Sequence, residues 1–153
     1  MRGEDEMAML YKKKVYAYIT REKEGVMQLL VFTHRDVPKE RIQIPGGIVR
    51  PEESLEAAIL RKVMEETGLR HLYIERFIDD YIIYVKERQE YEKHHFFHMS
   101  LLTKVRDTWE HIVTKENQSA TFCYEWVDIE RGPALTGKQG EFIYRLLEGM
   151  YVK

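Results

Sequence analysis

The segment 45–68 constrains the fold of this chain more than any other part of the sequence. It opens with the breaker cluster Pro-Gly-Gly at 45–47, where the chain must change direction sharply. Between Ser54 and Thr67 the apolar residues follow a helical period, acidic residues gather at the start, and Gly68 suits the C-cap. The sequence therefore predicts a tight turn followed by a helix over 54–67.

On a helical wheel this predicted helix has two faces of different chemistry. The apolar face, which should pack on a sheet, holds Leu55, Ile59, Leu60 and Val63. The charged face, which we expect to be exposed, holds Arg61, Lys62, Glu65 and Glu66. Taken alone, such a charged quartet is usually a solvated helix surface with i,i+4 ion pairs. The spacing of this quartet from the glycine turn, however, indicates more than a solvated surface.

Composition limits both the fold and the class of partner. With 153 residues, of which 44% are hydrophobic, the chain predicts a single domain over 1–153 with a real core and a flexible segment at 1–10. A formal net charge of -2 argues against a protein that coats a nucleic-acid polymer. The single Cys123, the lack of a secretory signal and the lack of a long apolar run predict a cytoplasmic protein without a membrane partner.

Most of the remaining chain has the composition of strands. A hairpin around Gly25 is predicted from two runs rich in β-branched and aromatic residues, at 15–20 and 26–32. Further strands are expected at 72–79, 81–86, 94–103 and 121–129, whereas 34–41 and 106–119 resemble loops. Apolar residues at helical spacing predict a closing helix over 138–151 that packs on the sheet.

The glycine turn and the helix together resemble the box of the Nudix hydrolase superfamily. That box reads Gly, five residues, Glu, seven residues, then Arg-Glu-aliphatic-x-Glu-Glu-x-Gly-aliphatic. Eight of its nine constrained positions are matched here, by Gly47, Glu53, Arg61, Val63, Glu65, Glu66, Gly68 and Leu69. Because six named residues at fixed offsets arise by accident with a chance of about one in ten million per start position, the resemblance is specific.

The resemblance implies a fold and an activity. The fold would be an α/β/α sandwich with a mixed β-sheet between helices, and the activity would be hydrolysis of a diphosphate bond in a nucleoside diphosphate linked to another moiety. Mg²⁺, with Mn²⁺ as an alternative, would be the cofactor, since Mg²⁺ prefers hard oxygen ligands and shares them with phosphates. The small-molecule partner would be a nucleotide derivative. The sequence leaves open whether the chain forms a homodimer.

The resemblance also assigns roles to individual residues. Glu65 and Glu66 would bind the metal together with the Gly46 carbonyl, Arg61 would orient the glutamates, and Glu53 would support the same network. A further carboxylate is expected from a loop before the last strand, for which Glu116 is the candidate. Glu110 and Glu125 lie close to it in the sequence and are the alternatives.

One position departs from the box, because Lys62 stands where the family carries its first glutamate. The replacement removes an oxygen ligand and changes the local charge by two units, and a lysine beside two acids is a poor general base. Three outcomes follow from it. Another residue such as Glu116 supplies the base, or the ammonium binds the substrate phosphate while fewer metals are used, or hydrolysis is lost and the chain is a nucleotide-binding or regulatory protein.

The histidines at 94 and 98 suggest zinc at first sight, but the strand pattern argues against a shared ion. On one face of a strand these two residues would lie roughly 13 Å apart, at about 3.3 Å per residue. One face of this strand is instead expected to line a substrate cleft. Tyr81 and Tyr84 follow the box where some dinucleoside polyphosphate hydrolases of the family carry a tyrosine, but a chain with ten tyrosines makes this match loose.

Overall fold

The computed structural model describes residues 11–37 and 41–151, so the predicted flexible segment 1–10 lies outside the described residues. In the described part, one mixed sheet of seven strands is formed. The strands are β1 (Tyr11–Lys23), β2 (Val26–His34), β3 (Gly46–Ile48), β4 (Leu72–Val85), β5 (Glu90–Leu101), β6 (Thr108–Lys115) and β7 (Gln118–Asp128). The helices are α2 (Leu55–Thr67), the short 3-10 helix η1 (Ile129–Arg131) and α3 (Ile143–Tyr151).

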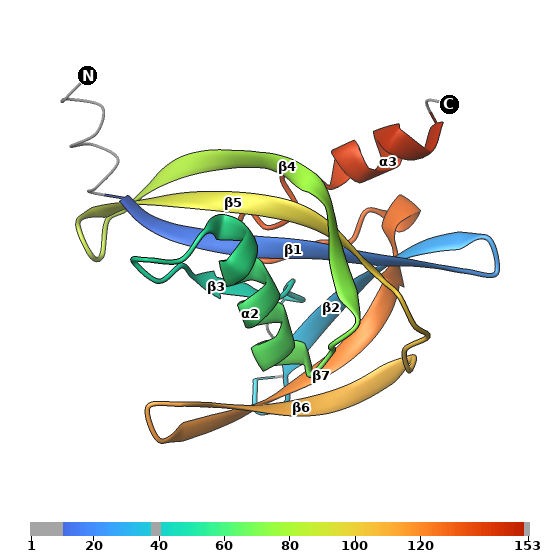
Figure 1. Ribbon diagram of the computed structural model, residues 1–153, viewed down its shortest axis with the longest axis horizontal. Coiled ribbons are helices and arrows are strands. Elements are labelled where there is room, and N and C mark those ends of the chain that lie inside the picture. The colour runs from blue at the N-terminus through green and yellow to red at the C-terminus, as the bar shows by residue number, and fades with distance from the viewer. Residues whose placement is uncertain (1–10, 38–40, 152–153) are drawn as a thin grey trace.

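The sheet has the strand order β4-β5-β1-β2-β7-β6, and β3 pairs with β1 outside this path. The pairing of β1 with β5 is parallel, whereas the other pairings are antiparallel. Figure 1 shows α2 in the angle between the β4-β5-β1 part and the β2-β7-β6 part of the sheet. The strand β1 joins the two parts, since it pairs with β5 along its length and with β2 near its end.

Alternation along β1 divides the interior into two cores. Val15, Ala17 and Ile19 are fully buried in a cluster that also contains the apolar residues of α2. Tyr18, on the opposite face, belongs to a second cluster with Phe142, Ile143 and Leu146 at and just before the start of α3. Because successive strand residues point to opposite faces, one strand supplies both layers. This arrangement confirms the predicted α/β/α sandwich with a mixed sheet between helices.

The predicted helix over 54–67 is confirmed, as are its caps. Ser54 adopts an extended backbone conformation, and its side chain accepts a hydrogen bond from the backbone N–H of Ala57. Gly68 ends the helix in the left-handed conformation with φ 79°. Ile59 and Val63 are completely buried. No helix within the described ranges is long and apolar enough to cross a lipid bilayer.

The loop predicted over 106–119 is wrong, because residues 108–115 form strand β6. Its side chains alternate: Trp109 and Val113 pack against the core beneath α2, whereas Ile112 is largely exposed. Glu116 and Asn117 form the two-residue turn to β7, both with positive φ, which suits the twist of a tight hairpin. The charged residues of this segment concealed its period of two.

Other boundaries also differ from the prediction; the strand expected at 94–103, for example, is β5 at 90–101. The segments 72–79 and 81–86 are one strand, β4, whose register against β5 shifts between Ile74 and Arg76 and between Phe77 and Asp79. The closing helix begins at Ile143 instead of residue 138. Residues 137–142 form turns, because the Gln139 carbonyl accepts from the Tyr18 hydroxyl and its side-chain oxygen accepts from the Ile44 N–H.

Replacing Ile59 by Ala should test how firmly α2 is packed. Removing a fully buried side chain leaves a cavity, so we expect a loss of about 2–5 kcal/mol in the free energy of unfolding, measured by urea denaturation. Met64→Ala, on the exposed side of the same helix, is the control and should change stability by less than about 1 kcal/mol. Equal effects of the two changes would contradict the packing described here.

Candidate functional site

The site is built around the C-terminal half of α2, whose last carbonyl groups are bound by side chains from β6 and β7. The carbonyl oxygens of Glu65, Glu66 and Thr67 accept hydrogen bonds of 3.0, 2.9 and 2.9 Å. The donors are His111, Tyr124 and Trp109 respectively. Helix ends leave carbonyls without intrahelical partners, so these three bonds fix the rotation of the helix on the sheet. The sequence reasoning did not find the three donors, although a period-two reading of 108–115 would have placed Trp109 and His111 together.

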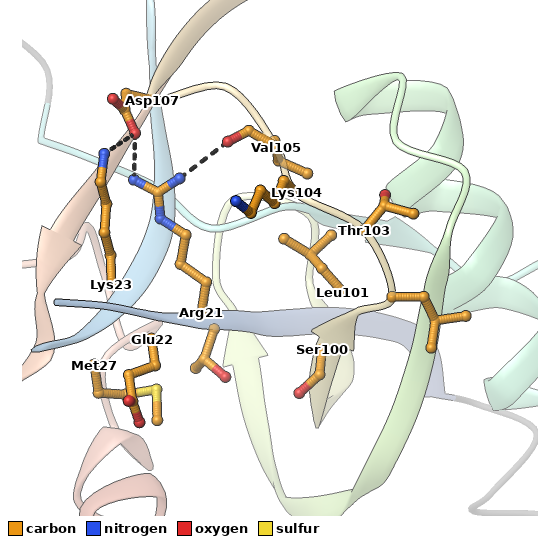
Figure 2. A pocket seen from close by; sticks show the side chains of 12 residues that line it. Arg21, Glu22, Lys23, Met27, Ser100, Leu101, Thr103, Lys104, Val105 and Asp107 are labelled. Carbon is orange, nitrogen blue, oxygen red and sulfur yellow. Dashed lines mark hydrogen bonds and ion pairs between the residues drawn. The ribbon is translucent and has the colours of Figure 1, made fainter. Parts of the chain in front are cut away.

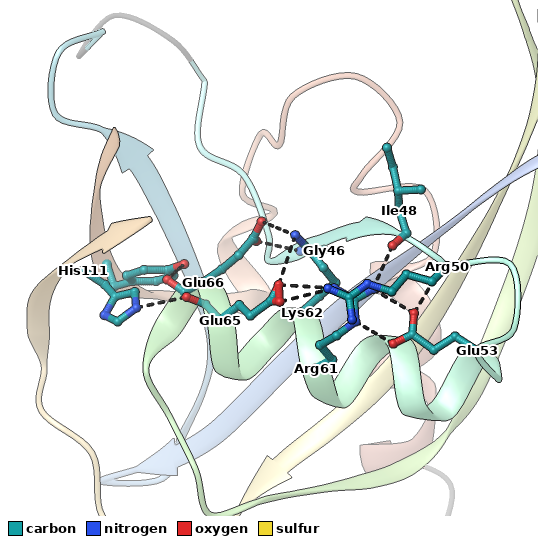
Figure 3. A network of polar contacts seen from close by, with 10 residues as sticks. Gly46, Ile48, Arg50, Glu53, Arg61, Lys62, Glu65, Glu66 and His111 are labelled. Atoms are coloured by element: carbon teal, nitrogen blue, oxygen red, sulfur yellow. Dashed lines mark hydrogen bonds and ion pairs between the residues drawn. The ribbon is translucent and has the colours of Figure 1, made fainter. Parts of the chain in front are cut away.

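Arg61 ties the helix to the loop that precedes it. Its guanidinium binds the Glu53 carboxylate through two bonds, Nε to Oε2 at 2.5 Å and Nη2 to Oε1 at 2.8 Å. It also donates to the Ile48 carbonyl at 3.1 Å and pairs with Glu65 at 3.2 Å (Figure 3). Such two-pronged contacts fix both orientation and distance. The hydrogen bond from Arg61 is the main reason that the pKa of Glu53 falls to about 2.

Glu66 lies at the glycine turn and is mostly buried. The Gly46 N–H donates to its Oε1 at 3.1 Å, and the Lys62 ammonium lies 3.5 Å from its Oε2. The same ammonium lies 3.8 Å from the nearer oxygen of Glu65. Burial raises the pKa of Glu66, opposed by the nearby positive charge of Lys62 and by the Gly46 N–H. The side chains of Lys62 and Glu66 are each only 12% exposed, so the expectation of an entirely exposed charged face is wrong for these two residues.

The two glycines of the turn make close contacts of different kinds. A Cβ atom on Gly46 would lie 2.3 Å from the Val15 carbonyl oxygen, so β1 requires a glycine at this position. A Cβ atom on Gly47 would lie 2.2 Å from Cε of Lys62. Gly47 therefore leaves the room that the Lys62 side chain fills, and Lys62 is held against the turn, beside both glutamates.

A cleft of about 680 Å³ opens beside this network and brings Glu116 to it. Arg61, Lys62 and Glu65 line one wall, and the end of the β6-β7 hairpin, including Glu116, lines another. Of the three acidic candidates from the sequence, only Glu116 lines this cleft. Glu110 pairs with Arg35, at 3.5 Å, and Glu125 lines a different cavity.

Besides the cavity that Glu125 lines, two cavities among the described residues lie apart from this cleft. One, of about 600 Å³, is lined by Tyr16, Tyr81 and His94 on the α3 side of the sheet. The other, of about 710 Å³, lies near the ends of β1 and β5 (Figure 2). Two of its cations, Arg21 and Lys23, share the single carboxylate of Asp107, each at 2.7 Å.

The chemistry of the carboxylates fits a hard divalent cation, although the site has its own positive charge. Glu65 and Glu66 supply oxygen atoms that can act as metal ligands. The Lys62 ammonium lies beside both carboxylates and provides positive charge there. No group of three His, Cys, Asp or Glu side chains within 11–37 and 41–151 is arranged to hold a metal. His94 and His98 have separate hydrogen-bond partners, Glu92 and Thr20.

Comparisons with known proteins agree on one family. The family model of the NUDIX domain matches residues 10–146. Among solved structures, the NUDIX domain of Shewanella oneidensis NrtR complexed with ADP ribose is similar, with a TM-score of 0.66 and 16% identity over 92% of this chain and 88% of that one. A C. elegans Ap4A hydrolase binary complex has a TM-score of 0.65 and 18% identity over 91% and 97%. A MutT protein from Methanosarcina mazei Go1 has a TM-score of 0.61 and 23% identity over 92% and 96%.

The two glycines of the turn should respond differently to alanine. Gly46→Ala meets backbone and should cost about 1–3 kcal/mol in the free energy of unfolding. Gly47→Ala should cost less than about 1 kcal/mol, because the tip of Lys62 can swing away. Gly140→Ala, whose nearest neighbour would lie at 3.7 Å, is the control for urea denaturation. A larger cost at Gly47 than at Gly46 would contradict these contacts.

The bond between Glu53 and Arg61 should give stability a defined dependence on pH. The pKa of Glu53 is lowered from 4.5 to about 2, so its contribution is present above about pH 4.5 and is lost as the pH falls toward 2. We expect the difference in unfolding free energy between wild type and Glu53→Gln to shrink between about pH 6 and about pH 2.5. Glu52→Gln, on the same loop, is the control, since Glu52 forms no ion pair with the residues that the structure describes. A difference that stays constant with pH would refute this interaction.

Proposed function

The chain belongs to the Nudix family, and we propose that it hydrolyses a diphosphate bond in a nucleoside diphosphate linked to another moiety. One observation carries the proposal: the network of Arg61, Glu53 and Glu65 lies beside the contact of Glu66 with Gly46, at the edge of an open cleft. Solved relatives are named as a hydrolase of Ap4A and as a domain in complex with ADP ribose. Both compounds contain nucleoside phosphate anhydrides.

The cleft has the charge that a diphosphate requires. Arg50, Arg61, Lys62 and Lys115 all line it. Arg61 and Lys62 each lie beside two carboxylates, so Arg50 and Lys115 are the lining cations that have no ion pair among the described residues and remain to contact phosphate oxygens. A concave site lined by cations concentrates anionic ligands.

We assign the metal to the acidic side of the same cleft. Mg²⁺, or Mn²⁺ in its place, would be held by Glu65, Glu66, the Gly46 carbonyl and Glu116, and would supply charge neutralisation and a water of lowered pKa. The protein supplies the positioning: Arg61 holds Glu65 in place, and the Gly46 N–H holds Glu66. Glu116, which lines the cleft from the hairpin, is the candidate to accept a proton from the attacking water.

A second candidate function follows from the position of Lys62. Its ammonium lies beside both glutamates and is packed on Gly47, where it supplies positive charge without an ion. According to this second candidate function, the chain binds a nucleotide through the same cleft and regulates a partner, and it does not cleave its ligand. The two candidates differ in whether a divalent cation replaces the ammonium during turnover.

Removing one carboxylate should separate the two candidates. We expect the wild type to hydrolyse at least one member of a panel of nucleoside diphosphate derivatives with Mg²⁺ or Mn²⁺, measured by phosphate-product release. Glu66→Gln should lower kcat/KM by about 100-fold or more, because a charged ligand of the reacting centre is lost. Glu56→Gln, exposed on the first turn of α2, is the matched control and should keep full activity.

The same panel shows how the hydrolase proposal would fail. An inert wild type together with a Lys62→Glu variant that gains turnover would favour the binding function. If all of these variants are inert while a nucleotide still raises the melting temperature, the hydrolase proposal is wrong.

A further inference from the structure

The pocket on the α3 side of the sheet has features that the diphosphate cleft lacks. Its volume is about 600 Å³, and its walls include Tyr16, Tyr81 and His94. It adjoins the glycine turn, since a Cβ atom on Gly46 would lie 2.5 Å from the Tyr16 ring. Gln139, which also lines it, accepts from the Ile44 N–H just before that turn. Aromatic walls with a few polar groups suit a nucleobase.

A buried carboxylate lies behind the pocket. Glu92 is 1% exposed, and its Oε1 is 2.8 Å from Nε2 of His94 and 3.5 Å from the Lys14 ammonium. Arg88 binds its other oxygen. Although burial favours the neutral acid, the hydrogen bond from His94 and the charges of Lys14 and Arg88 hold the pKa of Glu92 below its usual value. Glu92 is therefore an ionised group that can only accept hydrogen bonds.

This acceptor determines the tautomer of His94. Because Glu92 has no proton to give, Nε2 of His94 must carry the hydrogen and donate it. Burial lowers the pKa of His94, so the ring is neutral and its Nδ1 is a bare acceptor. The Tyr81 hydroxyl lies 3.1 Å from Nδ1. Burial raises the pKa of Tyr81, so the hydroxyl keeps its proton and donates it to His94.

These hydrogen bonds leave the Tyr81 hydroxyl as a hydrogen-bond acceptor toward any ligand in the pocket. With its only proton given to His94, the Tyr81 hydroxyl can offer nothing but lone pairs to a molecule in the pocket. A ligand amino group satisfies that oxygen, whereas a carbonyl in the same place would face it with like polarity. We propose that this pocket binds the base of the nucleotide substrate and that Glu92, through His94 and Tyr81, selects adenine over the corresponding 6-oxo base.

This inference rests on the proposed function only for the nature of the substrate. Glu92 and His94 are positioning residues, since they act through Tyr81. Tyr81 is the residue that would contact the ligand. The pocket is separate from the diphosphate cleft, so base selection can be tested with ligands that contain no diphosphate bond.

The experiment measures binding of AMP and IMP by titration calorimetry, because the two differ only at the C6–N1 edge of the base, where the amino group and bare N1 of adenine become a carbonyl and an N1–H. Wild type should bind AMP about tenfold more tightly than IMP. Tyr81→Phe should bring the two affinities to about the same value. Tyr73→Phe, exposed on the same strand β4 and outside the pocket, is the matched control and should keep the tenfold preference.

Glu92→Gln gives a readout that loss of structure alone would not produce. Arg88 hydrogen-bonds one oxygen of Glu92, whereas Lys14 is only within ion-pair distance, at 3.5 Å, of the oxygen beside His94. The amide oxygen of the variant should therefore face Arg88, so the amide NH₂ faces Nε2 of His94 and moves the ring proton to Nδ1. Tyr81 must then accept from His94 and donate into the pocket, and the preference should reverse toward IMP. Equal affinities for AMP and IMP in the wild type, a preference that survives Tyr81→Phe, or an unchanged preference in folded Glu92→Gln would each overturn the proposal.

The outcomes separate this inference from the proposed hydrolysis. AMP and IMP contain no diphosphate, so a preference for AMP in a chain that hydrolyses nothing would support base selection and refute only the hydrolase. Hydrolysis of derivatives with either base at equal kcat/KM, together with absent AMP binding, would refute base selection alone.

Discussion

The site depends first on how the end of α2 is held against the sheet. His111, Trp109 and Tyr124 each donate to one of three consecutive carbonyls at the end of the helix. A helix with its carbonyls so bound cannot rotate about its axis without losing all three hydrogen bonds. The rotation in turn decides which side chains meet the glycine turn. The positions of Lys62 and Glu66 beside Gly46 and Gly47 follow from these contacts on β6 and β7.

The charge at the turn is the point where this chain departs from its family's box. A glutamate at position 62 would add a third negative charge next to Glu65 and Glu66, which would need a cation from solution. The Lys62 side chain supplies a positive charge as part of the protein itself, and its aliphatic part fills the space that Gly47 leaves. A divalent ion that binds here competes with the Lys62 ammonium. Because the lysine is part of the chain, placing its charge there costs no binding entropy. The position of Lys62 therefore provides a physical basis for either candidate function. One is hydrolysis with altered use of the metal, and the other is nucleotide binding without cleavage.

The sequence predicts those parts of the fold that depend on local chemistry. Ser54 and Gly68 mark the ends of α2, and the apolar spacing of Ile59 and Val63 gives its buried face. The strand β6 is not predicted, because the charged residues of 106–119 obscure the alternation of its inward and outward side chains. The approach of Glu116 to Lys62 depends on that hairpin. The contact of Glu92 with Lys14 depends on the parallel pairing of β1 with β5, which local patterns do not contain.

The pairing of β1 with β5 also bears on how the molecule folds. It joins Val15 to His95, so the glycine turn, α2 and β4 all lie inside the loop that this pairing closes. Contacts between residues so far apart in sequence form only after a large loss of chain entropy, and they tend to slow folding. The candidate site should therefore form only together with the complete sheet. Ligand binding would then stabilise the native state as a whole, not a preformed fragment of it.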